Sequence, residues 1–184
     1  MRRLVKELAS GKKILDGFSY TGGFALSALR GGAAKVDLVD DSPQALKMAK
    51  ENMALNGFPS SSFRLIKKDM FDFLKDETRL DYDLVILDPP AFAKKKADEK
   101  QAGRAYQQLN YLALSKMKPA SLLLTFSCSY YVRRELFQKI IFQAALQAHR
   151  QVRILTAHRQ SYDHPVSIFH PESDYLKGFL LYVS

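Results

Sequence analysis

The chain has 184 residues, of which 47% are hydrophobic and 26% are charged, a balance typical of one packed globular domain over 1–184. No apolar run approaches the roughly 18 residues that a membrane helix needs, and the amino terminus lacks the apolar stretch of a signal peptide, so we expect a cytoplasmic protein. The formal net charge is +9. This charge fits binding of a polyanion such as RNA and a basic surface without such a partner equally well.

The sequence shows no pattern that indicates a metal site. Its single cysteine, Cys128, excludes an intramolecular disulfide and a zinc site built from several cysteines. Its histidines are scattered without HExxH spacing, so we expect no metal. They are His149, His158, His164 and His170.

Short apolar strands alternate with amphipathic helices along the chain. In order, we expect a helix at 2–10, a strand at 13–16, a helix at 24–29, a strand at 35–40, a helix at 43–55, a strand at 63–66, a helix at 70–75, a strand at 82–87, a basic mobile loop at 91–100, a helix at 101–117, a strand at 121–126, a helix at 132–149 and strands at 153–157 and 178–183. This alternation predicts a Rossmann-like α/β fold, with a mostly parallel sheet covered by helices on both faces.

Polar side chains follow five of the predicted strands. They are Asp16, Asp40, Asp69, Asp88 and Cys128. Open parallel sheets bind ligands beyond the carboxyl ends of their strands, so we expect these residues to converge on one pocket. Any one of the acids could instead cap the following helix, but four at equivalent strand ends favour a ligand.

The loop after the first strand, 17–23, reads GFSYTGG and lacks the GxGxxG spacing of a dinucleotide site. Its glycines would let a ligand approach the backbone. The Asp40 carboxylate could accept hydrogen bonds from two ribose hydroxyls, and Asp69 with Met70 could flank an adenine. We expect the cofactor contacts to come from Asp16, Phe18, Tyr20, Thr21, Gly22, Asp40, Asp41, Asp69, Met70 and Asp88.

Several motifs resemble those of the bacterial 23S ribosomal RNA cytosine-C5 methyltransferase family. They are 18–24 (FSYTGGF), 39–40 (VD), 55–57 (LNG), 87–92 (LDPPAF), 124–129 (LTFSCS), 163–165 (DHP) and 175–178 (YLKG). The resemblance implies S-adenosylmethionine as cofactor, a seven-stranded class I methyltransferase sheet with an antiparallel last strand, and ribosomal RNA as substrate. Family members usually carry an N-terminal RNA-binding PUA module, which we expect this chain to lack.

Two residues are candidates for the chemistry that the resemblance implies. Carbon 5 of cytosine is a poor nucleophile, so a thiolate must first add to carbon 6 of a flipped-out base. Position alone leaves Cys128 open between this nucleophile and a small buried residue; the resemblance favours the nucleophile. We expect the next helix start and Arg133 and Arg134 to lower the thiol pKa, and a protonated Asp88 to stabilise nitrogen 3.

Other interpretations stay open. An Asp-Pro-Pro-aromatic loop, here 88–92, often marks methylation of an exocyclic amine, and a guanine-directed ribosomal RNA methyltransferase that uses Asp88, Pro89 and Pro90 belongs to the same alternative. A non-catalytic RNA-binding or cofactor-binding remnant is a third possibility. Tyr106 could pack in the core or face the pocket. Basic residues in 94–104 could bind RNA phosphates or form a solvated surface. We expect the substrate contacts to come from Pro89, Pro90, Phe92, Lys94 and Arg104.

Overall fold

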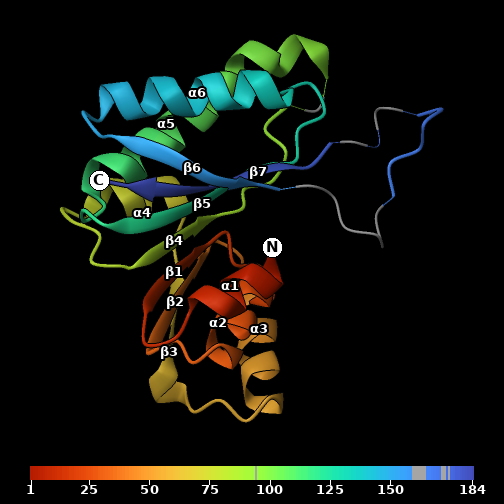
Figure 1. The fold of residues 1–184 in the computed structure, drawn as a ribbon. Helices are drawn as coiled ribbons and strands as arrows, with labels where there is room; N and C mark the ends of the chain where they lie inside the picture. The colour runs from red at the N-terminus through yellow and green to blue at the C-terminus, as the bar shows by residue number, and fades with distance from the viewer. Residues whose placement is uncertain (94, 159–164, 171–172, 174) are drawn as a thin grey trace.

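The computed structural model describes the whole chain except residues 94, 159–164, 171–172 and 174. The described residues form a seven-stranded sheet in the order β3-β2-β1-β4-β5-β7-β6 (Figure 1). The strands are β1 (Lys13–Gly17), β2 (Lys35–Asp40), β3 (Phe63–Lys67), β4 (Leu84–Leu87), β5 (Ser121–Ser127), β6 (Val152–Ala157) and β7 (Lys177–Val183). Strands β1 to β5 are parallel, and β7 runs antiparallel between β5 and β6. The predicted fold class is confirmed, including the reversed last strand.

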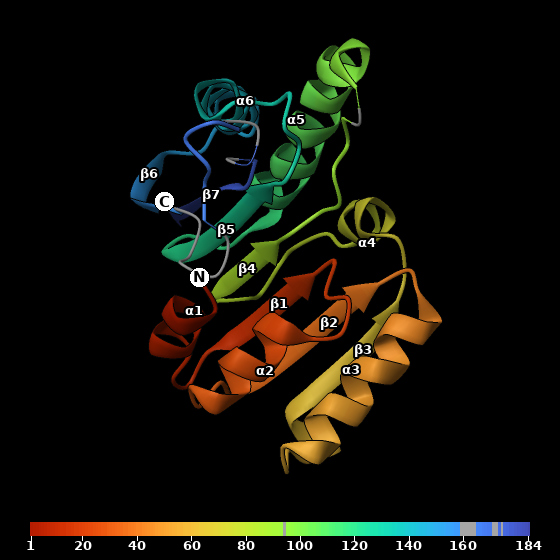
Figure 2. The ribbon, with the colours of Figure 1, turned by 90° about the vertical axis from the view of Figure 1, so that its right-hand side faces the viewer.

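Helices cover both faces of the sheet. They are α1 (Arg2–Leu8), α2 (Gly23–Arg30), α3 (Pro43–Leu55), α4 (Met70–Asp76), α5 (Glu99–Lys116) and α6 (Arg134–Gln147), with short 3-10 turns η1 (Ser60–Ser62) and η2 (Lys96–Asp98). Helices α1 to α3 lie on one face and α4 to α6 on the other (Figure 2). In the part of the chain that the structure describes, no helix combines the length and apolarity needed to cross a bilayer.

The strands separate two apolar cores because successive side chains point to opposite faces. Ile14 and Leu38 are buried beneath α1 to α3, whereas their neighbours Leu15 and Val39 are buried beneath α4 to α6. This double burial explains why the strands read as short continuous apolar runs in the sequence.

The segment 91–100 is shorter as a loop than the sequence predicts. The turn η2 occupies Lys96–Asp98, and α5 begins at Glu99. The main-chain N–H of Lys95 donates to the Asp98 carboxylate at 3.3 Å, a local contact that favours a turn. The prediction of a loop through residue 100 is therefore wrong, and Lys94 lies outside the described residues.

The strand register brings the predicted polar residues to one edge of the sheet. Gly17 at the end of β1 pairs with Val39 of β2 and with Leu87 of β4. Asp40 and Asp88 each come one residue later and therefore lie on either side of the first loop. The end of β5 lies beside the end of β4 (Figure 2). Cys128 comes directly after β5 and therefore extends the same row.

Candidate functional site

A cavity of about 590 Å³ opens at the carboxyl ends of β1 to β4, within the range of small-molecule sites. Its wall comes from the loops after these strands. The lining residues are Phe18, Tyr20, Val39, Asp40, Asp41, Ser42, Lys68, Asp69, Met70, Phe71, Asp88, Pro89, Pro90 and Phe92. Ten of these were predicted as cofactor or substrate contacts. The strand ends, together with the motif at 88–92 and the family resemblance, therefore predict most of the wall.

The half-buried Asp40 carboxylate is held in place by two main-chain groups. One oxygen accepts the N–H of Tyr20 at 2.8 Å, and the other accepts the N–H of Ser42 at 2.9 Å. Each carboxylate oxygen can accept a further hydrogen bond. The group is thus oriented in advance and can accept two hydroxyls of a ligand side by side.

The first loop adopts a conformation that non-glycine residues rarely take. Phe18 and Tyr20 have φ angles of 59° and 47°, and Gly22 has 79°. Such backbone strain is typical of ligand-binding turns. Thr21 and Gly22, which were predicted to contact the cofactor, do not line the cavity; the Thr21 carbonyl accepts a hydrogen bond from Asn52 at 3.0 Å.

Asp69 has both of the roles that the sequence left open. It lines the cavity, and its Oδ1 also caps α4 by accepting the N–H groups of Phe71 and Asp72 at 2.8 and 3.1 Å. Met70 is buried below it against Gly17, where an added Cβ would lie 2.8 Å from the Met70 sulfur. The glycine is therefore required by close packing behind the cavity.

Two further acids lie deeper at this edge. Asp16 is 1% exposed and accepts the N–H of Ala25 at 2.9 Å, so it caps α2 and does not line the cavity. Burial raises the pKa of Asp16 to about 8, which the Asp88 charge increases and the Arg2 guanidinium opposes. Burial also raises the pKa of Asp88 to about 6, again opposed by Arg2. Near neutral pH, Asp88 can hold or release a proton.

Cys128 follows β5 and lies against the loop that follows β4. Its thiol donates to the carbonyl oxygen of Pro89, with an Sγ to O distance of 3.5 Å. Burial raises the thiol pKa, the negative charge of Asp88 raises it further, and Lys177 opposes both. The predicted lowering of this pKa is wrong. Arg134 donates instead to the carbonyl of His158 at 2.9 Å.

Comparison with known proteins identifies the family. Residues 1–125 match the family of S-adenosylmethionine-dependent methyltransferases. The chain belongs to this family. The predicted cofactor, S-adenosylmethionine, is thereby confirmed.

Individual relatives agree with this assignment. Ribosomal RNA large subunit methyltransferase I of Aeromonas salmonicida is 43% identical over 182 residues, which are 98% of this chain and 46% of that protein. The protein of the same name from Photobacterium profundum is 42% identical over 184 residues, 99% of this chain and 46% of its own. The methyltransferase SMU.776, solved as a complex with SAH, has a TM-score of 0.86 at 26% identity, covering 98% of this chain and 47% of its own. The chain thus spans less than half the length of these relatives.

Two basic residues at or near the cavity were not predicted from the sequence. Arg2, the cation that faces Asp16 and Asp88, lies so close to Gly23 that a Cβ there would be 2.8 Å from its guanidinium. Lys68 lines the cavity, and it could have been predicted because it comes directly before Asp69. Arg2 gives no comparable signal, because its contact with the site crosses from α1 to the start of α2.

The predicted substrate residues have different environments in the structure. Pro89 is buried, Pro90 is exposed, and the Phe92 ring packs against Tyr106 in a tilted arrangement, with ring centroids 4.6 Å apart. Tyr106 is fully buried, so it supports the wall from behind. Arg104 is exposed on α5 and does not line the cavity.

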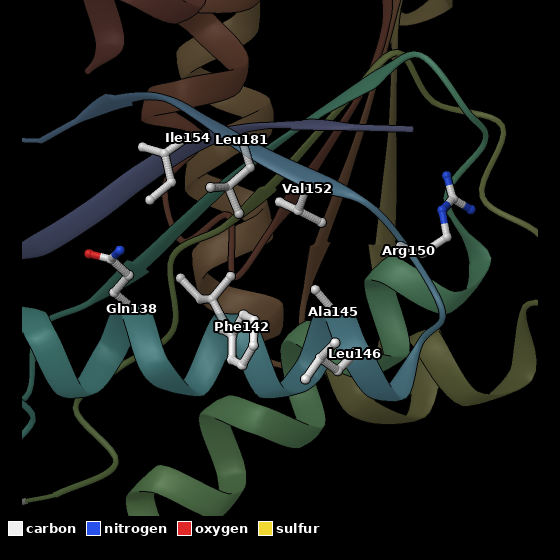
Figure 3. Close-up of a pocket in the computed structure, with 9 residues that line it drawn as sticks. Gln138, Phe142, Ala145, Leu146, Arg150, Val152, Ile154 and Leu181 are labelled. Atoms are coloured by element: carbon white, nitrogen blue, oxygen red, sulfur yellow. The ribbon is translucent and has the colours of Figure 1, made fainter.

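A second cavity, of about 270 Å³, lies between α6 and the strands β6 and β7 (Figure 3). Apolar side chains such as Phe142 and Ile154 dominate it, and its charged member, Arg150, donates to the carbonyls of Met117 and Ser184. It offers no acid, thiol or histidine for catalysis. No group of three or more potential metal ligands occurs among the described residues.

Proposed function

We propose that this chain is the catalytic domain of an RNA methyltransferase that modifies carbon 5 of cytosine in large-subunit ribosomal RNA through a covalent adduct with Cys128. The observation that carries the proposal is the 3.5 Å contact between the Cys128 thiol and Pro89. It joins the candidate nucleophile to the Asp88–Pro90 wall of the cofactor cavity. The names of the relatives, ribosomal RNA large subunit methyltransferase I, support the substrate class.

The residues of the cavity fit an adenosyl cofactor. The two oriented oxygens of Asp40 suit the vicinal hydroxyls of a ribose. Met70 and Phe71 offer apolar surface to the adenine, and Asp69 can accept from its amino group. When bound, the cofactor supplies an electrophilic methyl group on a sulfonium sulfur. Asp88, directly after β4, lines this cavity, and the Cys128 thiol would reach the substrate from the far side of Pro89, whose carbonyl it contacts.

The remaining steps belong to the side chains around Cys128. The deprotonated sulfur adds to carbon 6 of cytosine, and the electron pair of the 5,6 double bond makes carbon 5 nucleophilic toward the methyl group. Protonated Asp88 stabilises the charge that develops at nitrogen 3. After methylation, a base removes the carbon 5 proton, the carbon–sulfur bond breaks, and the thiolate leaves. The domain therefore requires a thiolate and a protonated Asp88 together.

The basic surface suits an RNA substrate. The net charge is +9. Exposed basic side chains follow the cavity wall in the sequence, before and within η2 and α5; they include Lys95, Lys96, Lys100 and Arg104. Contacts of such residues with phosphates strengthen binding without selecting sequence. We therefore assign them to RNA affinity and assign the choice of base to the cavity.

RNA containing 5-fluorocytosine tests the proposal. Fluorine cannot leave carbon 5 as a proton does, so the adduct persists and migrates with the protein in a denaturing gel. We expect an adduct with the wild-type chain that requires S-adenosylmethionine, and none with Cys128→Ala, although this variant should still bind S-adenosylhomocysteine. Methylation of unmodified RNA by Cys128→Ala would contradict the covalent mechanism.

Methylation of an exocyclic amine is the second candidate, and two observations favour it. The thiol pKa is raised rather than lowered, and the aromatic ring of Phe92, two residues after Pro90, lines the cavity. In that case the Asp88 carboxylate would hold the amine, and Cys128 would only pack. An active Cys128→Ala enzyme that yields an N-methylated base would establish this alternative.

A further inference from the structure

Lys177 is a buried lysine next to the candidate nucleophile. It is 3% exposed, and its Nζ donates to the main-chain carbonyls of Ser129 and Tyr175, each at 2.6 Å. It begins β7 and lies opposite Ser127 in the register with β5. Since burying an ammonium group is unfavourable unless it is well bonded, its contacts should constrain the segments that they join.

Ser129, the residue after Cys128, forms hydrogen bonds with three other segments. Its carbonyl accepts from Lys177 at 2.6 Å, while its side-chain oxygen bonds to the Tyr106 hydroxyl at 2.9 Å and accepts the N–H of Ala93 at 3.1 Å. The main chain beside Cys128 is thereby tied to β7, to α5 and to the loop after Pro89. A network in which each member is bonded restricts motion more than one isolated bond does.

The charges around the thiol come from three elements. Asp88 at the end of β4 disfavours the thiolate, and Tyr106 of α5 interacts with the thiol across the network. Lys177 of β7 is the cation that favours the thiolate. Arg134, which the sequence suggested for this role, is directed to the His158 carbonyl and lies over the Phe179 ring.

We propose that Lys177 is a positioning residue for the covalent step: its buried ammonium fixes the main chain beside Cys128 and keeps a positive charge next to the sulfur. This inference rests on the nucleophilic role of Cys128 in the proposed function. It adds a link between the thiol and the segment that enters β7, because the same ammonium binds Ser129 and Tyr175.

The single cysteine makes the inference measurable without RNA. The rate of alkylation by iodoacetamide between pH 6 and 10 reports the thiolate of Cys128 alone. We expect Lys177→Met to lower the rate at pH 8 at least about threefold and to move the profile to higher pH. Lys177→Arg should lie closer to wild type, and Lys177→Gln provides a second neutral variant if the methionine variant does not fold.

Lys116→Met is the matched control. The Lys116 ammonium also binds two main-chain carbonyls, those of Leu74 and Lys75, but it belongs to the last residue of α5 and joins that helix to the end of α4. Its loss should lower the melting temperature without shifting the alkylation profile. A profile within about twofold of wild type for a folded neutral variant at position 177 would overturn the inference. A missing 5-fluorocytosine adduct in wild type would instead contradict the proposed function.

Discussion

Replacing Asp40 with asparagine should weaken cofactor binding strongly. The amide keeps the size of the carboxylate but has one acceptor oxygen instead of two. In the structure both oxygens already accept main-chain N–H groups, from Tyr20 at 2.8 Å and from Ser42 at 2.9 Å. Whichever way the amide turns, its NH₂ group faces one of these donors, and it can no longer accept both ribose hydroxyls.

The expected loss follows from two charge-assisted hydrogen bonds. Each contributes about 1.5 to 3 kcal/mol, part of which water recovers, so we expect a loss of about 2 to 4 kcal/mol, or roughly 30- to 700-fold in affinity. Titration calorimetry with S-adenosylhomocysteine measures it directly. Asp41→Asn removes the same charge from the neighbouring exposed residue of the cavity wall and should change affinity less than about threefold. Equal losses in the two variants would refute the assigned role of Asp40.

Two further predictions concern the buried acids. Asp88→Asn removes a charge that raises the thiol pKa of Cys128, so alkylation of the thiol at pH 8 should become faster. Below about pH 6, where wild-type Asp88 is itself protonated, the alkylation rates of the variant and the wild type should become equal. Equal rates at every pH would contradict the assigned charge effect. Asp16 keeps its proton to about pH 8 in the folded protein, against an ordinary pKa of 3.8, so the folded state binds more protons than the unfolded state and loses stability as pH rises between these values. Asp16→Asn retains an acceptor for the Ala25 N–H and should flatten the melting temperature between pH 5 and 8; an unchanged slope would show that Asp16 titrates normally.

The position of the site could be predicted because it depends on periodicity. Strands alternate with helices, parallel strands end at one edge, and the residue that follows each strand must lie there. The proximity of Asp40 and Asp88 could therefore be predicted from their positions in the sequence. The helix boundaries were predictable where a cap marks them, as with Ser42, whose side chain accepts the N–H of Ala45 before Pro43 opens α3.

The electrostatics of the thiol could not be predicted in this way. Arg134 is close to Cys128 in sequence, but the start of α6 directs it toward β6 and β7. The cation that favours the thiolate, Lys177, comes from the last strand and reaches the site only because β7 pairs with β5. Burial of the thiol depends on long-range packing as well. Charge patterns along the chain carry little information about such contacts.

The division of roles among the acids also required the structure. Asp16, Asp40 and Asp69 look alike at strand ends. Asp16 turned out to cap α2 behind the cavity, Asp69 both caps α4 and lines the cavity, and Asp40 lines it with both oxygens oriented. Helix capping and ligand binding use the same carboxylate chemistry, so spacing alone does not separate them.

The assignment of the cavity to the cofactor can be checked by a crystal structure of the domain with S-adenosylhomocysteine. We expect the ribose hydroxyls on the Asp40 carboxylate, the adenine between Met70 and Phe71, and the cofactor sulfur facing the space between Asp88 and Cys128. A ligand bound at another surface, or one whose sulfur points away from the thiol, would contradict it.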